Sequence, residues 1–241
     1  MKRISVQVPV RGIIFDLGDV LFTWSPNTST AISAGIFRKI LSSPTWLEYE
    51  CGRLKQDACY EQIAQEFSIE ASQVVEAFAQ ARESLQPEDT VVTFLKHLRK
   101  SALVNVYAMS NVAREDFAAL SQKMDWSLFD QVFTSGAVGM RKPDPDFFSY
   151  VLEEIKLAPE QVIFIDDKQE NVLAADRLGI RGILFDNSTV HTLQTLLGDP
   201  VARGYEYLYR NAKQFDSITD GGVVVQDSFS ELLILEATQD Q

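Results

Sequence analysis

Hydrophobic residues follow two different spacings along the chain. Short, continuous apolar runs predict buried strands at residues 12–15, 104–109, 131–134, 162–165 and 182–185. Apolar residues at helical spacing lie between these runs, as in Val91, Leu95 and Leu98, in Phe147, Val151 and Ile155, and in Val172, Ala175 and Leu178. The last of these helices is followed by Gly179, a residue typical of helix C-termini. Strands that alternate with helices of this length predict an α/β fold, in which a parallel sheet carries helices on both faces.

The segment after the first strand has a different pattern. Residues 25–87 keep a helical spacing throughout, beginning with Ile32, Ile36 and Ile40. No strand pattern interrupts the segment, so we predict a small helical module inserted after the first strand. Residues 1–24 and 88–200 are then the core domain, and residues 201–241 form a C-terminal extension that follows a Gly-Asp-Pro turn.

The composition limits the classes of partner. The net charge of −12 and the pI near 4.6 argue against nucleic acid or an anionic membrane. No stretch approaches the roughly 20 apolar residues of a membrane span, and the N-terminal residues lack the apolar segment and cleavage site of a signal peptide. Cys51 and Cys59 have no metal-ligand spacing and are expected to be reduced, which indicates a cytoplasmic protein.

Four short polar motifs lie at or near the ends of the predicted strands. They are Asp-Leu-Gly-Asp-Val at residues 16–20, Ser110-Asn111, Lys142-Pro143 and Asp166-Asp167. Three of them follow an apolar run directly, and open parallel sheets bind ligands at the carboxyl ends of their strands. Acidic side chains suit a hard cation, whereas a hydroxyl, an amide and a lysine suit an anion. The motifs therefore predict one pocket equipped for phosphate chemistry.

The order and content of these motifs resemble the haloacid dehalogenase (HAD) superfamily, in its metal-dependent phosphatase branch. The resemblance covers residues 11–185 and includes Gly-Met-Arg-Lys-Pro at residues 139–143 and Asp-Asp-Lys-Gln-Glu-Asn-Val at residues 166–172. It implies a Rossmann-like core, with residues 25–87 as a helical cap over the active site. It also implies hydrolysis of a small organic phosphate with Mg²⁺ as the cofactor.

This resemblance assigns the catalytic and metal-binding roles. Asp16 is the implied nucleophile, whose carboxylate attacks phosphorus and forms an aspartyl-phosphate. The carboxylate and the phosphate repel each other, so a cation must lie between them, and Mg²⁺ prefers oxygen ligands. The expected ligands are Asp16, the backbone carbonyl of Gly18, and the pair Asp166 and Asp167. We expect Asp167 to bind directly and Asp166 to act from the outer shell, although the sequence does not rank the two.

Three further residues complete the implied phosphate site. Ser110 and Asn111 offer a hydroxyl, an amide and backbone N–H groups to the phosphoryl oxygens. Lys142 can neutralise both the phosphoryl group and Asp16 as charge develops. Arg141, which precedes Lys142, is expected to be a surface residue.

Gly18 departs from the pattern of most HAD phosphatases, which carry an aspartate two residues after the nucleophile. That aspartate protonates the leaving group, so its absence puts ordinary monoester chemistry in doubt and argues against a phosphomutase. Asp19 lies one residue further along the chain, and we do not transfer the role to it. Some HAD phosphatases that act on sugar 1-phosphates share the Asp-Leu-Gly pattern, so the change is compatible with activity.

Two features resemble fungal drimane- and albicanol-type sesquiterpene synthases. One is the extension, which resembles the passage that joins the HAD domain of these proteins to their cyclase domain. Residues 221–236 carry this resemblance, and we predict a turn at residues 217–222 and a helix after Asp227. The other is the string Asp-Asp-x-x-Glu at residues 166–170, which also resembles the metal–diphosphate motif of terpene synthases. Glu170 itself is expected to be a solvated or capping residue in the first turn of the following helix. These features favour a sesquiterpenyl or other prenyl phosphate or diphosphate as the substrate.

Other functions remain open. The Asp-Leu-Gly pattern supports a sugar-phosphate phosphatase equally well, and the loss of the general acid suits a non-catalytic scaffold domain. The retained acids and lysine argue against a scaffold, and dehalogenation needs no metal pocket. The cap aromatics either line an apolar substrate pocket or form the core of the cap itself; they are Phe37, Trp46, Tyr49 and Tyr60, with Trp24 at the edge.

Overall fold

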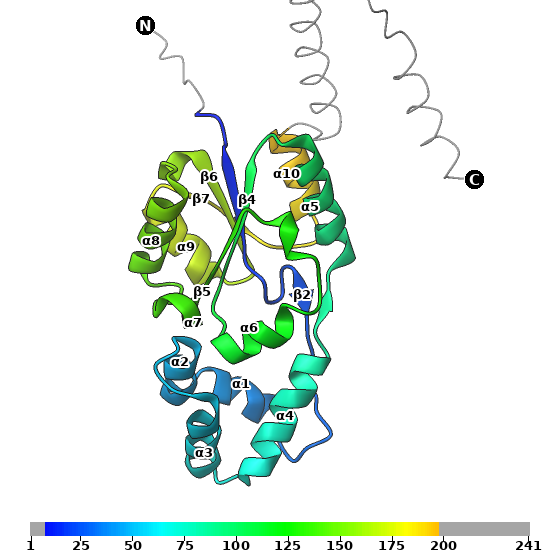
Figure 1. Cartoon of the computed structure of the whole chain (residues 1–241), viewed down its shortest axis with the longest axis vertical. Coiled ribbons are helices and arrows are strands. Elements are labelled where there is room, and N and C mark those ends of the chain that lie inside the picture. The colour runs from blue at the N-terminus through cyan, green and yellow to red at the C-terminus, as the bar shows by residue number, and fades with distance from the viewer. Residues whose placement is uncertain (1–7, 198–241) are drawn as a thin grey trace, which may run out of the picture. The chain divides into compact units, whose positions relative to one another are not determined.

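A computed structural model describes residues 8–197 of the chain (Figure 1). Its centre is a five-stranded parallel sheet in the order β5-β4-β1-β6-β7. The strands are β1 (Gly12–Phe15), β4 (Asn105–Ser110), β5 (Gln131–Thr134), β6 (Val162–Asp166) and β7 (Arg181–Leu184). They correspond to the five apolar runs of the sequence, with ends that shift by at most one residue. The predicted parallel sheet is confirmed.

The pleat of the sheet divides its side chains between two hydrophobic layers. Successive residues of a strand point to opposite faces, so Ile13 and Phe15 of β1 enter one layer and Ile14 enters the other. The β1 strand pairs with β4 on one side and β6 on the other, and all of its residues are buried. Such apolar strands need helices on both faces.

Helices cover both faces of this sheet (Figure 1). They are α5 (Asp89–Ser101), α8 (Pro145–Ile155), α9 (Gln169–Arg177) and α10 (Thr189–Leu197). The α5 and α10 helices pack on the layer that contains Phe15, whereas α8 and α9 pack on the layer that contains Ile14. Gly179, just after α9, has a φ of +87°, the left-handed conformation that glycine adopts readily. The predicted α/β fold is therefore confirmed.

The insert after β1 forms four helices with a hydrophobic core of their own, which we call the cap. The helices are α1 (Ala34–Leu41), α2 (Pro44–Glu50), α3 (Gln56–Phe67) and α4 (Ala71–Glu83). Each contributes aromatic side chains to one cluster, including Phe37, Tyr49, Tyr60 and Phe78. In the core, α6 (Arg114–Leu120) contacts α4, and α7 (Ser135–Val138) contacts α2 (Figure 1). These two core helices connect the cap to the loops at the ends of β4 and β5.

Two short strands join the cap to the core. They are β2 (Phe22–Thr23) and β3 (Gln86–Pro87), which pair antiparallel. The expectation of a purely helical insert is wrong at β3, because a two-residue strand is too short to show alternation. The α6 and α7 helices are also absent from the sequence prediction.

The described region ends with α10. Within residues 8–197, no helix has both the length and the apolar character that a membrane crossing requires. The turn and helix predicted for the extension lie outside the described residues.

Candidate active site

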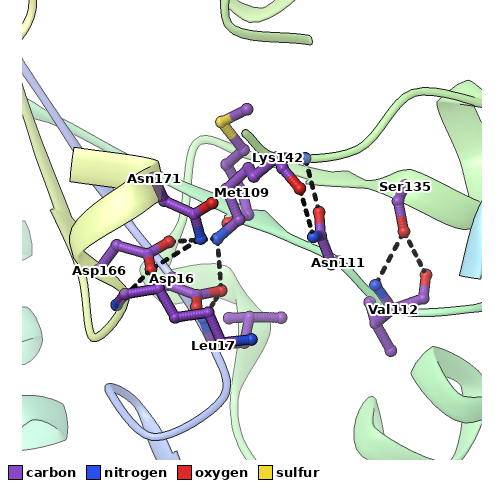
Figure 2. Close-up of polar contacts among 10 residues, drawn as sticks. Asp16, Leu17, Met109, Asn111, Val112, Ser135, Lys142, Asp166 and Asn171 are labelled. Atoms are coloured by element: carbon purple, nitrogen blue, oxygen red, sulfur yellow. Dashed lines mark hydrogen bonds and ion pairs between the residues drawn. The ribbon is translucent and has the colours of Figure 1, made fainter. Parts of the chain in front are cut away.

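The carboxyl ends of β1, β4 and β6 bring the polar motifs to one edge of the sheet. The β1 strand pairs in register with both of its neighbours, so the residues that follow these strands lie together. Figure 2 shows Asp16 and Asp166 beside the end of the Lys142 side chain, which comes from the loop before α8. Motifs that are far apart in the sequence thus form one cluster.

The ammonium group of Lys142 is buried and uses all three of its donors. It lies 2.8 Å from Asp16 Oδ1, 2.6 Å from Asp166 Oδ2 and 2.8 Å from the carbonyl oxygen of Met109. Burial alone would lower the pKa of Lys142, but attraction to the two carboxylates outweighs burial and raises this pKa above its ordinary value. Lys142 is therefore a fixed positive charge beside Asp16.

Asp166 is a fully buried carboxylate with both oxygens occupied. Its Oδ2 accepts from Lys142, and its Oδ1 accepts 2.9 Å hydrogen bonds from the backbone N–H of Lys168 and from Nδ2 of Asn171. Because both of its oxygens already accept hydrogen bonds, Asp166 is better suited to orienting Lys142 than to binding a cation directly. The sequence prediction assigns no role to Asn171. Its position in the first turn of α9, shortly after the acidic pair, is the signal that could have identified it as a partner of Asp166.

Asp167 offers an oxygen that is free to bind a cation. One carboxylate oxygen each of Asp16, Asp166 and Asp167 lies within 4.8 Å of the others. Asp167 Oδ1 is buried and accepts no hydrogen bond from the described residues. Burial, followed by the charge of Asp16, raises the pKa of Asp167 to about 6, and burial also raises the pKa of Asp16 despite Lys142. This donor set fits a hard divalent cation such as Mg²⁺, with Asp167 as a direct ligand and Asp166 behind it.

Ser110 and Asn111 lie at the end of β4, but their side chains are used differently. Ser110 is buried and lines the cavity described below. The amide of Asn111 binds the backbone of Lys142, where Oδ1 accepts from the N–H at 2.8 Å and Nδ2 donates to the carbonyl at 2.9 Å (Figure 2). This differs from the expected contact between the amide and a phosphoryl group, because both polar atoms hold the Lys142 loop. The backbone N–H of Asn111 is a further donor at this strand end.

Gly18 and Asp19 lie in the turn after β1. A Cβ atom on Gly18 would meet no atom within 4 Å, so the space that an aspartate side chain would enter is open. Asp19 is exposed, has a φ of 56° and accepts a hydrogen bond from Trp24 Nε1 at 3.2 Å. Its carboxylate is therefore held at the edge of the cap.

A cavity of about 180 Å³ leads from this edge of the sheet into the cap. Its core end is lined by Leu17, Gly18, Ser110 and Asn111, and its cap wall includes Trp24, Phe37, Trp46, Phe78 and Ala81. Trp46 stacks on Phe78 with ring centroids 4.4 Å apart, and Phe37 lies 4.5 Å from Phe78 by the same measure. The apolar wall of the cavity therefore extends from the cap to the motifs at residues 16–20 and 110–111.

The cap aromatics divide between the two roles expected for them. Trp24, Phe37 and Trp46 line the cavity, although Phe37 and Trp46 also belong to the buried core of the cap. Tyr49 and Tyr60 do not line it, and they are 0% and 3% exposed within the cap core. For these two tyrosines the packing interpretation is the correct one.

A polar pair also lines the cavity. Arg82 of α4 donates to Asp116 Oδ1 of α6 at 3.0 Å and to the hydroxyl of Tyr60 at 2.8 Å. Burial raises the pKa of Asp116 even though Arg82 opposes this change. The pair joins the cap to the core, and helical spacing alone does not predict it.

The expected position of Arg141 is wrong. Its side chain is only 30% exposed, and its Nη2 lies 3.2 Å from Oε2 of Glu50, at the end of α2 in the cap. The two residues are 91 positions apart in the sequence, so no local pattern links them. Arg141 therefore connects the loop that carries Lys142 to the cap.

Comparisons with known proteins agree with this geometry. Residues 10–179 match the model of the haloacid dehalogenase-like hydrolase family. Residues 201–241 match the model of the sesquiterpene cyclase astC-like C-terminal domain, in agreement with the resemblance found in the extension.

Individual relatives include enzymes of terpenoid metabolism. Drimenol cyclase drtB from Aspergillus calidoustus is 45% identical over 236 residues, which cover 96% of this chain and 45% of the relative. Sesquiterpene phosphatase astK from Aspergillus oryzae is 37% identical over 191 residues, which cover 78% of this chain and 97% of the relative. The chain thus spans less than half the length of drtB and nearly the full length of astK.

A solved structure shows the same fold. A HAD family enzyme from Bacteroides thetaiotaomicron, in complex with magnesium and inorganic phosphate, has a TM-score of 0.61 at 21% identity, with 75% of this chain and 98% of that chain covered. The family model matches most of the chain, and the described motifs lie at the strand ends where the resemblance predicts them. The chain belongs to the haloacid dehalogenase-like hydrolase family.

Proposed function

We propose that the protein is a Mg²⁺-dependent phosphatase that acts through an aspartyl-phosphate on a sesquiterpenyl or other prenyl phosphate or diphosphate. The observation that carries this proposal is the cavity, whose apolar cap wall ends at Gly18, Ser110 and Asn111, beside the polar cluster. An apolar chain in the cavity is stabilised by about 25 cal/mol per Å² of surface removed from water. The relatives support this substrate class, because astK is a sesquiterpene phosphatase and drtB is a drimenol cyclase.

Asp16 is the proposed nucleophile. One of its carboxylate oxygens attacks phosphorus, and the bond between phosphorus and the leaving oxygen breaks. The phosphoryl group stays on Asp16 until water attacks the same phosphorus atom and releases phosphate. Lys142 keeps the carboxylate in place, and its positive charge offsets the negative charge that gathers at the phosphoryl group.

The remaining groups of the site bind the anion and the cation. We propose that the Ser110 hydroxyl and the Asn111 backbone N–H donate to the phosphoryl oxygens. Asp16, Asp167 and the carbonyl oxygen of Gly18 are the proposed ligands of Mg²⁺, which supplies the charge that lets a carboxylate approach a phosphate.

The cap and the cysteines extend the proposal. We propose that residues 25–87 act as a lid, which excludes water and sets specificity. Cys51 and Cys59 are both free and buried, which supports a protein that works in the reducing cytoplasm.

A phosphate-release assay tests the proposed function. We expect prenyl phosphates and diphosphates to be hydrolysed in Mg²⁺ and not in EDTA, and to be preferred over sugar 1-phosphates. Turnover that survives thorough chelation would contradict the metal site. A preference for sugar phosphates would replace the prenyl substrate with the alternative, and no release from any phosphate would favour a scaffold.

Filling the cavity should weaken binding of the prenyl group. Ala81 lies on the cavity wall, so in Ala81→Phe the added ring occupies the space that an apolar chain would enter. We expect kcat/KM for a prenyl phosphate to fall at least about tenfold, or about 1.4 kcal/mol, while a small aryl phosphate is unaffected. Ala71→Phe, at an exposed position of the same helix, is the control. Equal losses for both substrates would count against a prenyl site in this cavity.

The open space at Gly18 predicts which bonds the enzyme cleaves best. Without a general acid, the ease of cleavage depends on the pKa of the leaving group. Phosphate has a second pKa of about 6, whereas the conjugate acid of an alkoxide has a pKa near that of water, about 15.7. Release of phosphate is therefore far easier. We therefore expect a prenyl diphosphate to be cleaved to the monophosphate faster than the monophosphate is cleaved to the alcohol. Gly18→Asp should raise kcat on simple alkyl monophosphates, by up to the roughly 10²–10⁴-fold typical of an acid catalyst.

Gly18→Asn is the matched control for this experiment, because asparagine has the same size but donates no acidic proton. If wild-type enzyme already prefers alkyl monophosphates and Gly18→Asp adds nothing, another group supplies the proton. Asp19 is then the first residue to replace.

A further inference from the structure

Glu50 lies between the cavity wall and the loop that carries Lys142. Its Oε1 accepts a 2.9 Å hydrogen bond from Nε1 of Trp46, and its Oε2 accepts a 3.2 Å hydrogen bond from Nη2 of Arg141. Trp46 lines the cavity, and Arg141 is the residue before Lys142. One carboxylate therefore contacts both the wall that would hold the substrate and the neighbour of the catalytic lysine.

The environment of Glu50 makes this contact different from a surface ion pair. Its side chain is 14% exposed, and burial raises its pKa although Arg141 and Trp46 act in the opposite direction. A charge held away from water is costly unless it is paired and hydrogen-bonded. Loss of either partner would leave a poorly solvated charge at the junction of the cap and the core.

The backbone fixes Glu50 relative to the phosphate-binding end of β4. The carbonyl of Glu50 accepts a 2.6 Å hydrogen bond from the hydroxyl of Ser135. The same hydroxyl accepts from the N–H of Val112 at 2.9 Å, and Figure 2 shows this contact between Ser135 and Val112. Two residues further along, Gly52 approaches the core so closely that a Cβ atom there would lie 2.5 Å from the carbonyl oxygen of Gly136. The corner after α2 is thus docked tightly against α7.

The Lys142 loop is held from both sides. Asn111 binds the backbone N–H and carbonyl of Lys142, and Glu50 binds the side chain of the preceding residue. Asn111 belongs to the core, so its hydrogen bonds to the Lys142 backbone do not depend on the cap. The contact between Glu50 and Arg141, in contrast, exists only when the cap is docked. Loss of that contact removes the ion pair between the cap and the residue that precedes Lys142, while Arg53 of the cap still donates to the carbonyl of Gly139 at 3.1 Å.

We propose that Glu50 is a positioning residue, which places the ammonium of Lys142 for phosphoryl transfer only when the cap is docked. Glu50 acts through Arg141 and touches no reacting atom, and Trp46 holds its carboxylate in the required orientation. The inference rests on the proposed phosphatase activity, because it assigns Lys142 a role in that reaction. It does not depend on the prenyl substrate.

Glu50→Gln tests the proposal with a small aryl phosphate, p-nitrophenyl phosphate, which does not need the cavity. Glutamine keeps the size of the side chain and an acceptor for Trp46, but it loses the charge that holds Arg141. We expect kcat to fall by roughly 10- to 100-fold, as for a misplaced catalytic group, with KM changed by less than about twofold. Prenyl substrates should show the same fall in kcat.

Glu61→Gln, on α3, is the control within the cap. Glu61 is exposed, and its side chain forms no ion pair or hydrogen bond with the described residues. The control should keep wild-type kcat and KM. Thermal unfolding of each variant separates a loss of positioning from a loss of fold.

A double-mutant cycle distinguishes positioning from simple docking of the cap. If Glu50 acts through Arg141, then Glu50→Gln and Arg141→Met each lower kcat, and the double variant loses no more than the larger single effect. Additive losses, or a Glu50→Gln variant with unchanged kcat on the aryl phosphate and a raised KM for prenyl substrates, would overturn the proposal. If Glu50→Gln does not fold, Trp46→Phe provides the test, since it removes the N–H donor together with part of the indole ring and should lower kcat on the aryl phosphate, which does not need the cavity.

The two proposals fail in different ways. A wild-type enzyme that hydrolyses the aryl phosphate but no prenyl phosphate would refute the prenyl substrate, while the kcat comparison still decides the role of Glu50. A wild-type enzyme that hydrolyses no phosphate ester in Mg²⁺ would refute both.

Discussion

Asp16→Asn is expected to lower turnover by at least about 10⁴-fold, a loss typical of removing a catalytic nucleophile from an otherwise intact site. The amide is almost the same size as the carboxylate, but it is a poor nucleophile and a weaker ligand for a divalent cation. Phosphate release under saturating substrate and Mg²⁺ measures the effect. Asp57→Asn, at an exposed position in the first turn of α3, is the control and should retain full activity.

The same variant should fold at least as well as the wild type when no metal is present. Burial raises the pKa of Asp16 in the folded protein, so at neutral pH the ionised carboxylate is less favourable there than in the unfolded chain. Asparagine removes this cost, and Lys142 keeps its contact with Asp166. We therefore expect a midpoint of thermal unfolding in EDTA equal to or above that of the wild type. Retained activity in this folded variant would contradict the aspartyl-phosphate mechanism.

The sheet could be predicted because its central strands, β1, β4 and β6, are short apolar runs buried on both faces. A residue that follows such a run lies at the edge where ligands bind, which is why Asp16 and the acidic pair after β6 were identifiable. The arrangement of parallel strands then brings distant motifs together without any further information. For this reason the backbone positions of the candidate site follow from the pattern of the sequence.

Side-chain partners could not be predicted in the same way. Asn111 is a residue type that can bind phosphate, yet its amide forms hydrogen bonds with the backbone of Lys142. Arginine is a residue type usually found at the surface, yet Arg141 forms an ion pair with Glu50 of the cap. Both contacts join segments separated by 31 and 91 positions, and neither helical nor strand spacing carries information over such distances.

The cap shows the same limit. Trp46 lines the cavity and Tyr49 lies in the cap core, although the two residues belong to the same short helix. Helical spacing identifies the residues that are buried, but it does not distinguish a wall that faces a cavity from a wall that faces another helix. The choice between the two depends on how α2 packs against α4 and the core.

Lys142→Met should reduce both activity and stability. The loss of its charge beside the phosphoryl group is expected to lower kcat by about 10²–10³-fold, as for the loss of one preorganised donor. Methionine fills most of the same volume but leaves two buried carboxylates without their cation, since Asp16 and Asp166 both contact the lysine ammonium. Removing one partner of a buried ion pair typically costs about 3–5 kcal/mol, and we expect a loss of this size in the free energy of unfolding.

Two measurements separate these effects. Activity is assayed at a temperature where circular dichroism shows the variant to be folded, and stability is measured by denaturant unfolding. Lys100→Met, at the exposed end of α5, is the matched control and should change neither quantity appreciably. Asp166 keeps its hydrogen bonds from Lys168 and Asn171 in the variant, so Asp16 is the carboxylate that loses most of its compensation. If Lys142→Met retained wild-type kcat, the positive charge would not be needed for phosphoryl transfer, and the inferred role of Glu50 would fail with it.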